Sequence, residues 1–190
     1  MEYIVLDTET CPIKLEGYLE LSETERKKLI NPIDSKLVAI GLRHNSRNII
    51  LQDENEKKML EEFWKELAEI KKKKKETKIV GFNVKDFDLP VLVTRSFINN
   101  VVIEPFVLKD VIDLREKVSA FRYGQTRGKL KEFGEFMGIE LHEMDGSQVA
   151  EECIKGNFEK IKEYLNKDLE ITEKMLKRII ETRIIEIEKW

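Results

Sequence analysis

Two carboxylates stand two residues apart near the beginning of the chain, at the end of an apolar run. Residues 3–10 read YIVLDTET, so Asp7 and Glu9 follow residue types that favour a buried strand. Side chains of a strand alternate between its faces, and these two therefore project from one face, about 7 Å apart. Carboxylates placed in this way can share one divalent cation. The alternative is that Asp7 and Glu9 only mark the end of a buried strand and bind no cation.

A second acidic group lies much later in the chain. Residues 163–168 read EYLNKD, and Tyr164 and Asp168 are four residues apart. On a helix they would share one face, about one turn apart. Because Ile161, Leu165 and Thr172 fall on the same face, Asp168 is expected in the buried stripe of that helix. A buried carboxylate needs a partner, and a divalent cation is the simplest one.

A third stretch, residues 81–92, reads GFNVKDFDLPVL and offers two aspartates. If Asp86 capped the following helix, Pro90 would occupy the fourth helical position, whose N–H normally makes the first helical bond, and proline has no N–H. A helix that begins at or after Asp88 avoids this loss. The helix dipole would then favour the ionised form of Asp88. Asp88 as a simple N-cap has the same geometry, so both interpretations stay open.

In order and content, these three stretches resemble the motifs of 3′-5′ exonucleases of the DEDD superfamily, in the branch whose third motif is YxxxD. The middle stretch is similar to the proofreading exonuclease domain of family B DNA polymerases, because Asn83 stands five residues before Asp88 and FDLP follows. Residues 145–149, DGSQV, resemble stand-alone predicted exonucleases related to that domain. The likeness extends from residue 1 to about residue 176. It implies an α/β, RNase H-like fold with a mixed central sheet and helices on both faces.

The resemblance also implies an activity and its cofactors. It predicts a metal-dependent 3′-5′ exonuclease that hydrolyses phosphodiester bonds at single-stranded 3′ ends of nucleic acid, with DNA favoured. Two Mg²⁺ or Mn²⁺ ions, about 3.5 to 4 Å apart, would hold the attacking and leaving oxygens in line. By resemblance, Asp7 would bridge both ions, Glu9 and Asp168 would complete one site, Asp88 would serve the other, and Tyr164 would orient the water.

Further positions of the same motifs are expected to bind substrate. Thr10, Asn83 and Phe87 match positions that hold the 3′ end by hydrogen bonds and base stacking. Leu130 matches a less firm element, because Lys129 stands where serine or threonine is expected. The additional catalytic lysine of the family has three candidates in this chain, namely Lys155, Lys160 and Lys162. The alternative function is a non-catalytic module of the same fold that binds nucleic acid or protein.

Hydrophobic periodicity places these motifs on regular elements. Residues 37–42 and 48–51 predict a hairpin, residues 78–82 a further strand, and residues 101–113 hold a fifth strand. Helices are predicted from Glu56 onward and over residues 89–97, 130–137, 145–155 and about 158–188. Asp113 is expected to cap a helix. The second motif therefore lies on a strand-to-helix turn, where open α/β sheets commonly place active sites.

Length and composition bound the remaining expectations. A chain of 190 residues predicts a single domain over residues 1–190. With 34 basic and 37 acidic residues, the net charge of −3 gives no overall attraction for nucleic acid, so binding needs a local basic patch. The stretch 119–131 is a candidate, since it carries Arg122, Arg127, Lys129 and Lys131 beside Tyr123.

The compartment is predicted from cysteine usage and apolar runs. Two cysteines, Cys11 and Cys153, are too few for a disulfide framework, and both are expected to be reduced. No apolar run reaches the roughly 18 residues of a membrane span, and Met1 leads directly into a strand rather than a signal peptide. We therefore expect a cytoplasmic protein without membrane contact. The oligomeric state is not predicted.

Overall fold

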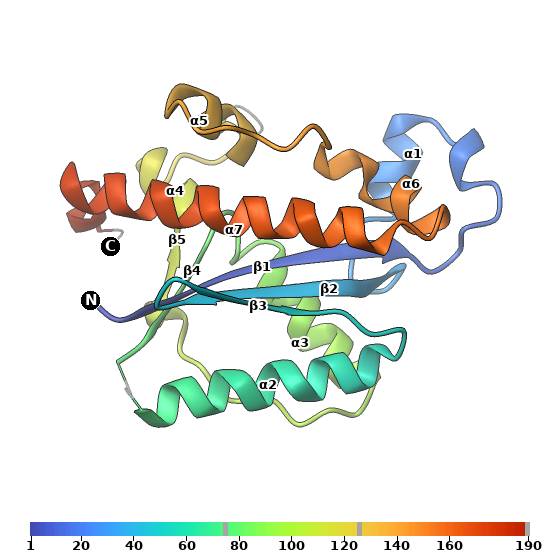
Figure 1. Ribbon diagram of the computed structural model, residues 1–190, viewed down its shortest axis with the longest axis horizontal. Helices are drawn as coiled ribbons and strands as arrows, with labels where there is room; N and C mark the ends of the chain where they lie inside the picture. Colours follow the sequence, from blue (N-terminus) through green and yellow to red (C-terminus); the bar gives the residue numbers. More distant parts are fainter. Residues whose placement is uncertain (74–75, 125–126, 189–190) are drawn as a thin grey trace.

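The computed structural model, which describes residues 1–73, 76–124 and 127–188, has a five-stranded sheet between two layers of helices (Figure 1). The strands lie in the order β3-β2-β1-β4-β5. Their bounds are Tyr3–Pro12 for β1, Ser35–His44 for β2, Arg47–Leu51 for β3, Lys78–Gly81 for β4 and Val111–Asp113 for β5. Strands β1, β2 and β3 pair antiparallel, whereas β1, β4 and β5 pair parallel. The predicted α/β fold with a mixed sheet is confirmed.

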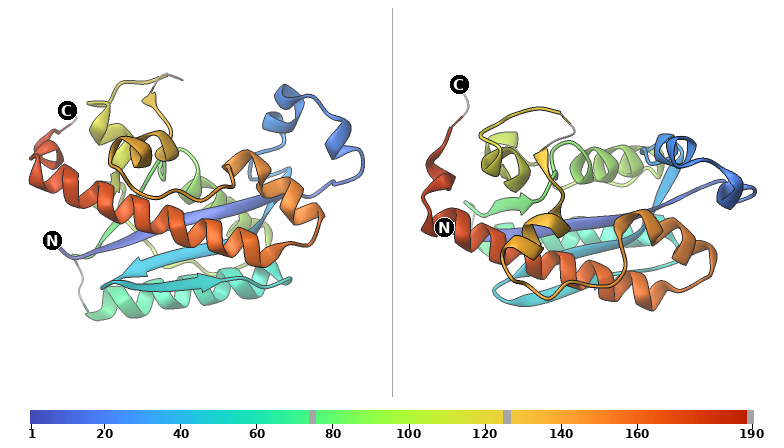
Figure 2. Two further views of the ribbon diagram at one scale, coloured as in Figure 1. Left: turned by 45° about the horizontal axis from the view of Figure 1, so that its top comes forward. Right: turned by 90° about the horizontal axis from the view of Figure 1, so that it is seen from above.

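Helices cover both faces of this sheet (Figures 1 and 2). Their bounds are α1 Glu23–Lys28, α2 Glu56–Lys73, α3 Asp88–Ile98, α4 Leu114–Val118, α5 Leu130–Phe136, α6 Val149–Ile154 and α7 Phe158–Glu181. Short 3-10 turns occur at Tyr18–Glu20, Leu108–Asp110, Gly146–Gln148 and Ile184–Glu186, labelled η1, η2, η4 and η5. Within the described residues, no helix is both long and apolar enough to cross a membrane.

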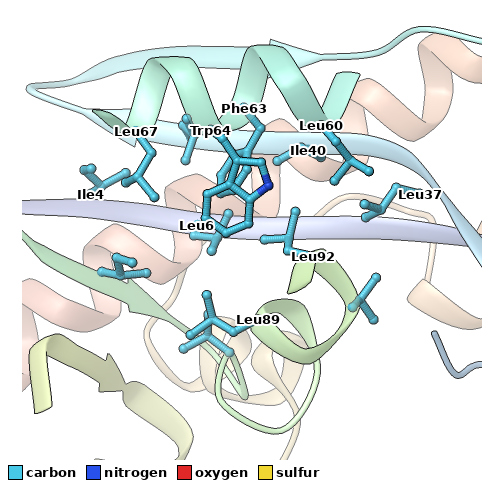
Figure 3. Packing of buried hydrophobic residues seen from close by; sticks show 14 of the residues in the cluster. Ile4, Leu6, Leu37, Ile40, Leu60, Phe63, Trp64, Leu67, Leu89 and Leu92 are labelled. Atoms are coloured by element: carbon cyan, nitrogen blue, oxygen red, sulfur yellow. The ribbon is translucent and has the colours of Figure 1, made fainter. Parts of the chain in front are cut away.

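The larger core lies between the sheet and helix α2. Apolar residues recur along one face of α2 at helical spacing, and they pack on the even-numbered residues Ile4 and Leu6 of β1 (Figure 3). Phe63 and Trp64 are buried there, and the indole N–H of Trp64 donates to Ser96 Oγ at 2.7 Å. This core fixes which face of β1 is turned away from α2. That opposite face carries the odd-numbered residues.

Helix α7 crosses the opposite face, and a glycine of β2 allows its close approach. A Cβ atom added to Gly41 would lie 2.8 Å from Leu169 Cδ1 and 3.0 Å from Leu165 Cγ. Gly41 is the β2 partner of Asp7 in the sheet. The absence of a side chain at Gly41 therefore lets α7 lie against the strand pair at the level of Asp7.

The prediction of reduced cysteines is wrong in this structure, because Cys11 and Cys153 form a disulfide. Cys11 lies near the end of β1 and Cys153 in α6, 142 residues later, and both are buried in one apolar cluster. Sequence spacing gives no sign of this pairing, since the packing of α6 on β1 brings the two together. The bond ties α6 to the strand that carries Asp7 and Glu9.

Two predicted elements are shorter in the structure than in the sequence pattern. The fifth strand is limited to Val111–Asp113. The long C-terminal helix begins at Phe158 but ends at Glu181, because Arg183 adopts a left-handed backbone with φ 61°. The turn η5 then brings Ile184 and Ile185 against an apolar cluster beside α7. These two isoleucines near the end of the chain are therefore partly buried.

Candidate active site

Three carboxylates from β1 and α7 converge on one point. One oxygen from each of Asp7, Glu9 and Asp168 lies within 4.8 Å of the other two. Strand alternation brings Asp7 and Glu9 to the same face, and the close packing of α7 on β2 delivers Asp168 to them. Glu9 is buried, whereas Asp7 and Asp168 are half-buried.

Asp88 approaches this region from the turn that follows β4. Strand β4 ends at Gly81, and the following turn leads into α3, whose first residue is Asp88. Asp88 is 2% exposed, and the hydroxyl of Thr8 on β1 donates to its Oδ1 at 2.6 Å. Asp86, in contrast, is exposed and forms an ion pair with Arg127 at 3.1 Å. The helix therefore begins where Pro90 predicts it to begin.

Burial and mutual repulsion disfavour the charged forms of these carboxylates. Burial, followed by the charges of Asp88, Glu9 and Asp168, raises the pKa of Asp7 well above its ordinary value. Burial likewise raises the pKa of Glu9 well above its ordinary value, and the charge of Asp168 adds to the shift. Burial raises the pKa of Asp88 to about 7 and that of Asp168 to about 6.

The donor set fits a divalent cation. Clustered carboxylates raise one another's pKa only while their negative charges remain uncompensated, and a bound cation removes that repulsion. Hard cations such as Mg²⁺ and Mn²⁺ prefer oxygen ligands of this kind. Asp7, Glu9 and Asp168 supply them from a rigid strand and a long helix, with Asp88 interacting electrostatically with the first two.

Tyr164 lies one helical turn before Asp168 and is held at the same site. Its side chain hydrogen-bonds to Asp168, which lowers the pKa of that carboxyl and opposes part of the effect of burial. Burial first, and then the charge of Asp168, raises the pKa of Tyr164 well above its ordinary value, so the phenol stays protonated. The hydroxyl would lie 3.2 Å from a Cβ atom added to Gly146. Gly146 belongs to the DGSQV run, and its position in the sequence gives no sign that it lies next to Tyr164.

The predicted substrate-binding residues lie in different environments. Thr10 follows Glu9 at a point where the β1–β2 register shifts. Asn83 has a left-handed backbone, and its Oδ1 accepts a hydrogen bond from Arg115 Nη1 at 3.1 Å. Phe87 is half-buried and packs against the α2-side core. Leu130 differs from these, because it lines a cavity.

That cavity of about 620 Å³ opens beside Tyr164, between the α1 region and the segments of α5 and η4. Lys129, Leu130 and Lys131 line one side of it, and Tyr18 and Arg26 line another. The charge of Lys131 lowers the pKa of Asp168, so this lysine acts on the carboxylate cluster. Sequence reasoning named it only as part of a basic stretch.

The three candidates for the additional catalytic lysine, and Arg127 of the basic stretch, form ion pairs with other carboxylates. Lys155 and Lys160 pair with Glu152 at 3.3 and 3.2 Å, and Lys162 pairs with Glu159 at 3.7 Å. Arg127 is paired with Asp86, and its side chain is only 8% exposed. Within the predicted basic stretch, residues 125 and 126 lie outside the described part of the chain. Its exposed members include Arg122 and Lys129.

Sequence comparisons identify a matching family and a relative of this chain. Residues 39–111 match a family model described as a predicted 3'-5' exonuclease related to the exonuclease domain of PolB. An uncharacterized protein of Methanocaldococcus jannaschii is 34% identical over 168 residues, which cover 83% of this chain and 93% of that protein.

A likeness of fold is also found among solved structures. The family B DNA polymerase of the hyperthermophilic archaeon Pyrobaculum calidifontis matches with a TM-score of 0.71 at 16% identity, over 97% of this chain. The matched region is 25% of the polymerase chain, so the present chain spans about a quarter of that protein. Together with the mixed sheet flanked by helices, this likeness identifies the fold as RNase H-like.

Proposed function

The chain belongs to the family of predicted 3'-5' exonucleases related to the exonuclease domain of PolB, and from this membership we propose that it is a metal-dependent 3′-5′ exonuclease. Its substrate in this proposal is the single-stranded 3′ end of nucleic acid, with DNA favoured over RNA. The observation that carries the proposal is the convergence of oxygens from Asp7, Glu9 and Asp168 within 4.8 Å.

The residues that would hold the cofactor are the four carboxylates. Asp7, Glu9 and Asp168 would bind one Mg²⁺ or Mn²⁺, and Asp88 would contribute to a second ion shared with Asp7. When bound, such ions offset charge on a phosphodiester and lower the pKa of water. The hydrogen bond from Thr8 keeps the Asp88 side chain fixed at its place beside β1.

The remaining residues would position the reacting groups. Tyr164 keeps its proton and would use its hydroxyl to orient the attacking water, because burial and nearby carboxylates hold its pKa high. Thr10 and Asn83 would form hydrogen bonds with the 3′ end of the nucleic acid. Phe87 would offer an aromatic face, which binds unpaired bases of any sequence by stacking. Leu130, which lines the cavity beside Tyr164, would contact the nucleic acid.

The test is a digestion of matched 5′-labelled DNA and RNA oligonucleotides with Mn²⁺ or Mg²⁺. We expect stepwise shortening from the 3′ end, faster on single-stranded DNA. The variant Asp7→Ala should lose at least about 100-fold of this activity while remaining folded, because it removes a carboxylate from the centre of the cluster. Equal activity of Asp7→Ala and the wild-type protein would contradict the proposal. Binding without shortening would instead support a non-catalytic binding module.

A further inference from the structure

Asp113 is a buried carboxylate at the end of β5, beside the turn that leads into Asp88. Gly81 and Asp113 are paired residues of the parallel strands β4 and β5. The segments that leave these two strands therefore start next to each other. One is helix α4 and the other is the turn of residues 82–87. Because Asp113 is only 2% exposed, protein donors must compensate its charge.

Four backbone N–H groups from these two segments donate to Asp113. Those of Arg115 and Glu116 donate to Oδ1 at 2.9 and 3.3 Å and form the N-cap of α4. The N–H of Asn83 donates to the same oxygen at 3.0 Å, and the N–H of Lys85 donates to Oδ2 at 3.1 Å. A helix cap needs only the first pair. The second pair fastens the β4–α3 turn.

The turn also has an unusual local conformation. Asn83 has φ 64°, in the left-handed region, which costs most residues other than glycine energy and asparagine less. The N–H of Phe87 donates to the carbonyl of Asn83 at 3.0 Å, and the N–H of Leu89 donates to that of Val84 at 3.0 Å. The turn is thus one hydrogen-bonded unit that ends at Asp88, and its position sets the position of that carboxylate.

Other links between the same segments involve side chains that are more exposed. They are Arg115 Nη1–Asn83 Oδ1 at 3.1 Å, Lys85–Glu116 at 2.7 Å and Arg127–Asp86 at 3.1 Å. Each of these links joins a single pair of side chains, whereas Asp113 accepts from four backbone N–H groups, and buried hydrogen bonds to a charged acceptor are among the stronger ones. Asp113 is therefore the main anchor of the turn.

We propose that Asp113 is a positioning residue of the candidate active site. By holding the backbone of Asn83 and Lys85, it fixes where Asp88 meets Asp7 and Glu9. It acts through the turn, without contact to cation or substrate. The inference rests on the proposed function, since it takes Asp88 as a ligand of a divalent cation.

Two variants separate this role from helix capping. Asp113→Ser retains an N-cap side chain for α4, because serine caps about as well as aspartate, but its shorter side chain leaves the N–H of Asn83 and Lys85 without their acceptor. Asp113→Asn retains Oδ1 and hence three of the four bonds, and loses only the acceptor for Lys85. The Asp113→Ser variant should therefore bind the cation less well than the Asp113→Asn variant.

Two quantities are measured. One is Mn²⁺ binding, monitored by electron paramagnetic resonance of free Mn²⁺, and the other is the exchange rate of the backbone amide hydrogens. We expect Asp113→Ser to weaken Mn²⁺ binding roughly 10-fold, a value typical for residues that orient metal ligands. Its amides at Asn83 and Lys85 should exchange faster, whereas those of α4 stay protected. Asp113→Asn should show a smaller shift in binding and faster exchange at Lys85 alone.

Wild-type Mn²⁺ affinity in a folded Asp113→Ser protein would overturn the inference. If the serine variant does not fold, Asp113→Asn decides in the same way, since unchanged affinity with faster exchange at Lys85 would mean that the turn does not position Asp88. The proposed function fails separately. A wild-type protein that binds Mn²⁺ and never shortens an oligonucleotide would refute the exonuclease, while the Mn²⁺ titrations would still test Asp113.

Discussion

At the scale of single residues, the second motif gives the sharpest distinction between two neighbouring aspartates. Asp88→Asn keeps an oxygen that can accept from Thr8, so the fold should persist, but it removes the charge that attracts a cation. We expect cleavage to fall at least about 100-fold without a loss of melting temperature, because the neutral amide also avoids the cost of a buried charge. The comparison is a rate measurement on one labelled oligonucleotide.

Asp86→Asn is the matched control for this change. Asp86 is exposed, and asparagine can still accept from Arg127, so cleavage should remain near the wild-type rate. If Asp86→Asn were the inactive variant, the assignment of Asp88 to the site would be wrong.

Tyr164 tests whether a single hydroxyl orients the attacking water. Tyr164→Phe should reduce kcat roughly 10- to 100-fold, while the Mn²⁺ concentration for half-maximal rate changes little, because all four carboxylates remain. Tyr18→Phe is the control, since Tyr18 lines the same cavity. An equal loss in both variants would show that the cavity, and not the Tyr164 hydroxyl, matters.

At the scale of elements, the disulfide between β1 and α6 is expected to stabilise the sheet. Removal of a disulfide commonly costs about 2 to 5 kcal/mol, and the bond here closes a loop across 142 positions of sequence. The double variant Cys11→Ala, Cys153→Ala should therefore melt well below the wild type. A reductant should lower the melting temperature of the wild type and leave that of the double variant unchanged. Two alkylated thiols in denatured, unreduced wild type would contradict the bond.

The elements also show which parts of the site can be read from sequence. Strand alternation placed Asp7 and Glu9 on one face, helical spacing placed Tyr164 with Asp168, and Pro90 located the start of α3. All three depend on residues only a few positions apart. Other features depend on packing between distant segments, which leaves no local pattern in the sequence. They are the Cys11–Cys153 bond, the hydrogen bonds from Asn83 and Lys85 to Asp113, and the contact of Gly146 with Tyr164. The functional roles of the site residues stay predictions.

At the scale of the whole molecule, the carboxylate cluster should make stability depend on pH. The pKa of Asp88 is raised from 3.8 to about 7 and that of Asp168 to about 6. Between the ordinary and the raised values, the folded state binds more protons than the unfolded state, so stability falls as pH rises. In a metal chelator, the melting temperature should therefore decrease from about pH 4 to pH 7. A loss of about 2 kcal/mol would lower it by roughly 4 to 8 °C.

Mn²⁺ at pH 7 should reverse this decrease, because a ligand that binds only the folded state stabilises it. Asp7→Ala, which lacks one of the repelling carboxylates, should show a flatter pH profile and a smaller effect of Mn²⁺. If the melting temperature of the wild type changed neither between about pH 4 and pH 7 nor on addition of Mn²⁺, this would argue against a cation site at the carboxylate cluster.

The placement of Asp168 on α7 has a consequence for the order in which the protein is made. Asp168 follows Asp88 by 80 residues, so at about 5 to 20 residues per second a ribosome needs roughly 4 to 16 s between them. During that interval the growing chain already contains β1 and α3, but it lacks the helix that completes the cluster. A half-made chain on the ribosome therefore lacks the complete carboxylate cluster, which can form only after α7 has docked on β1 and β2.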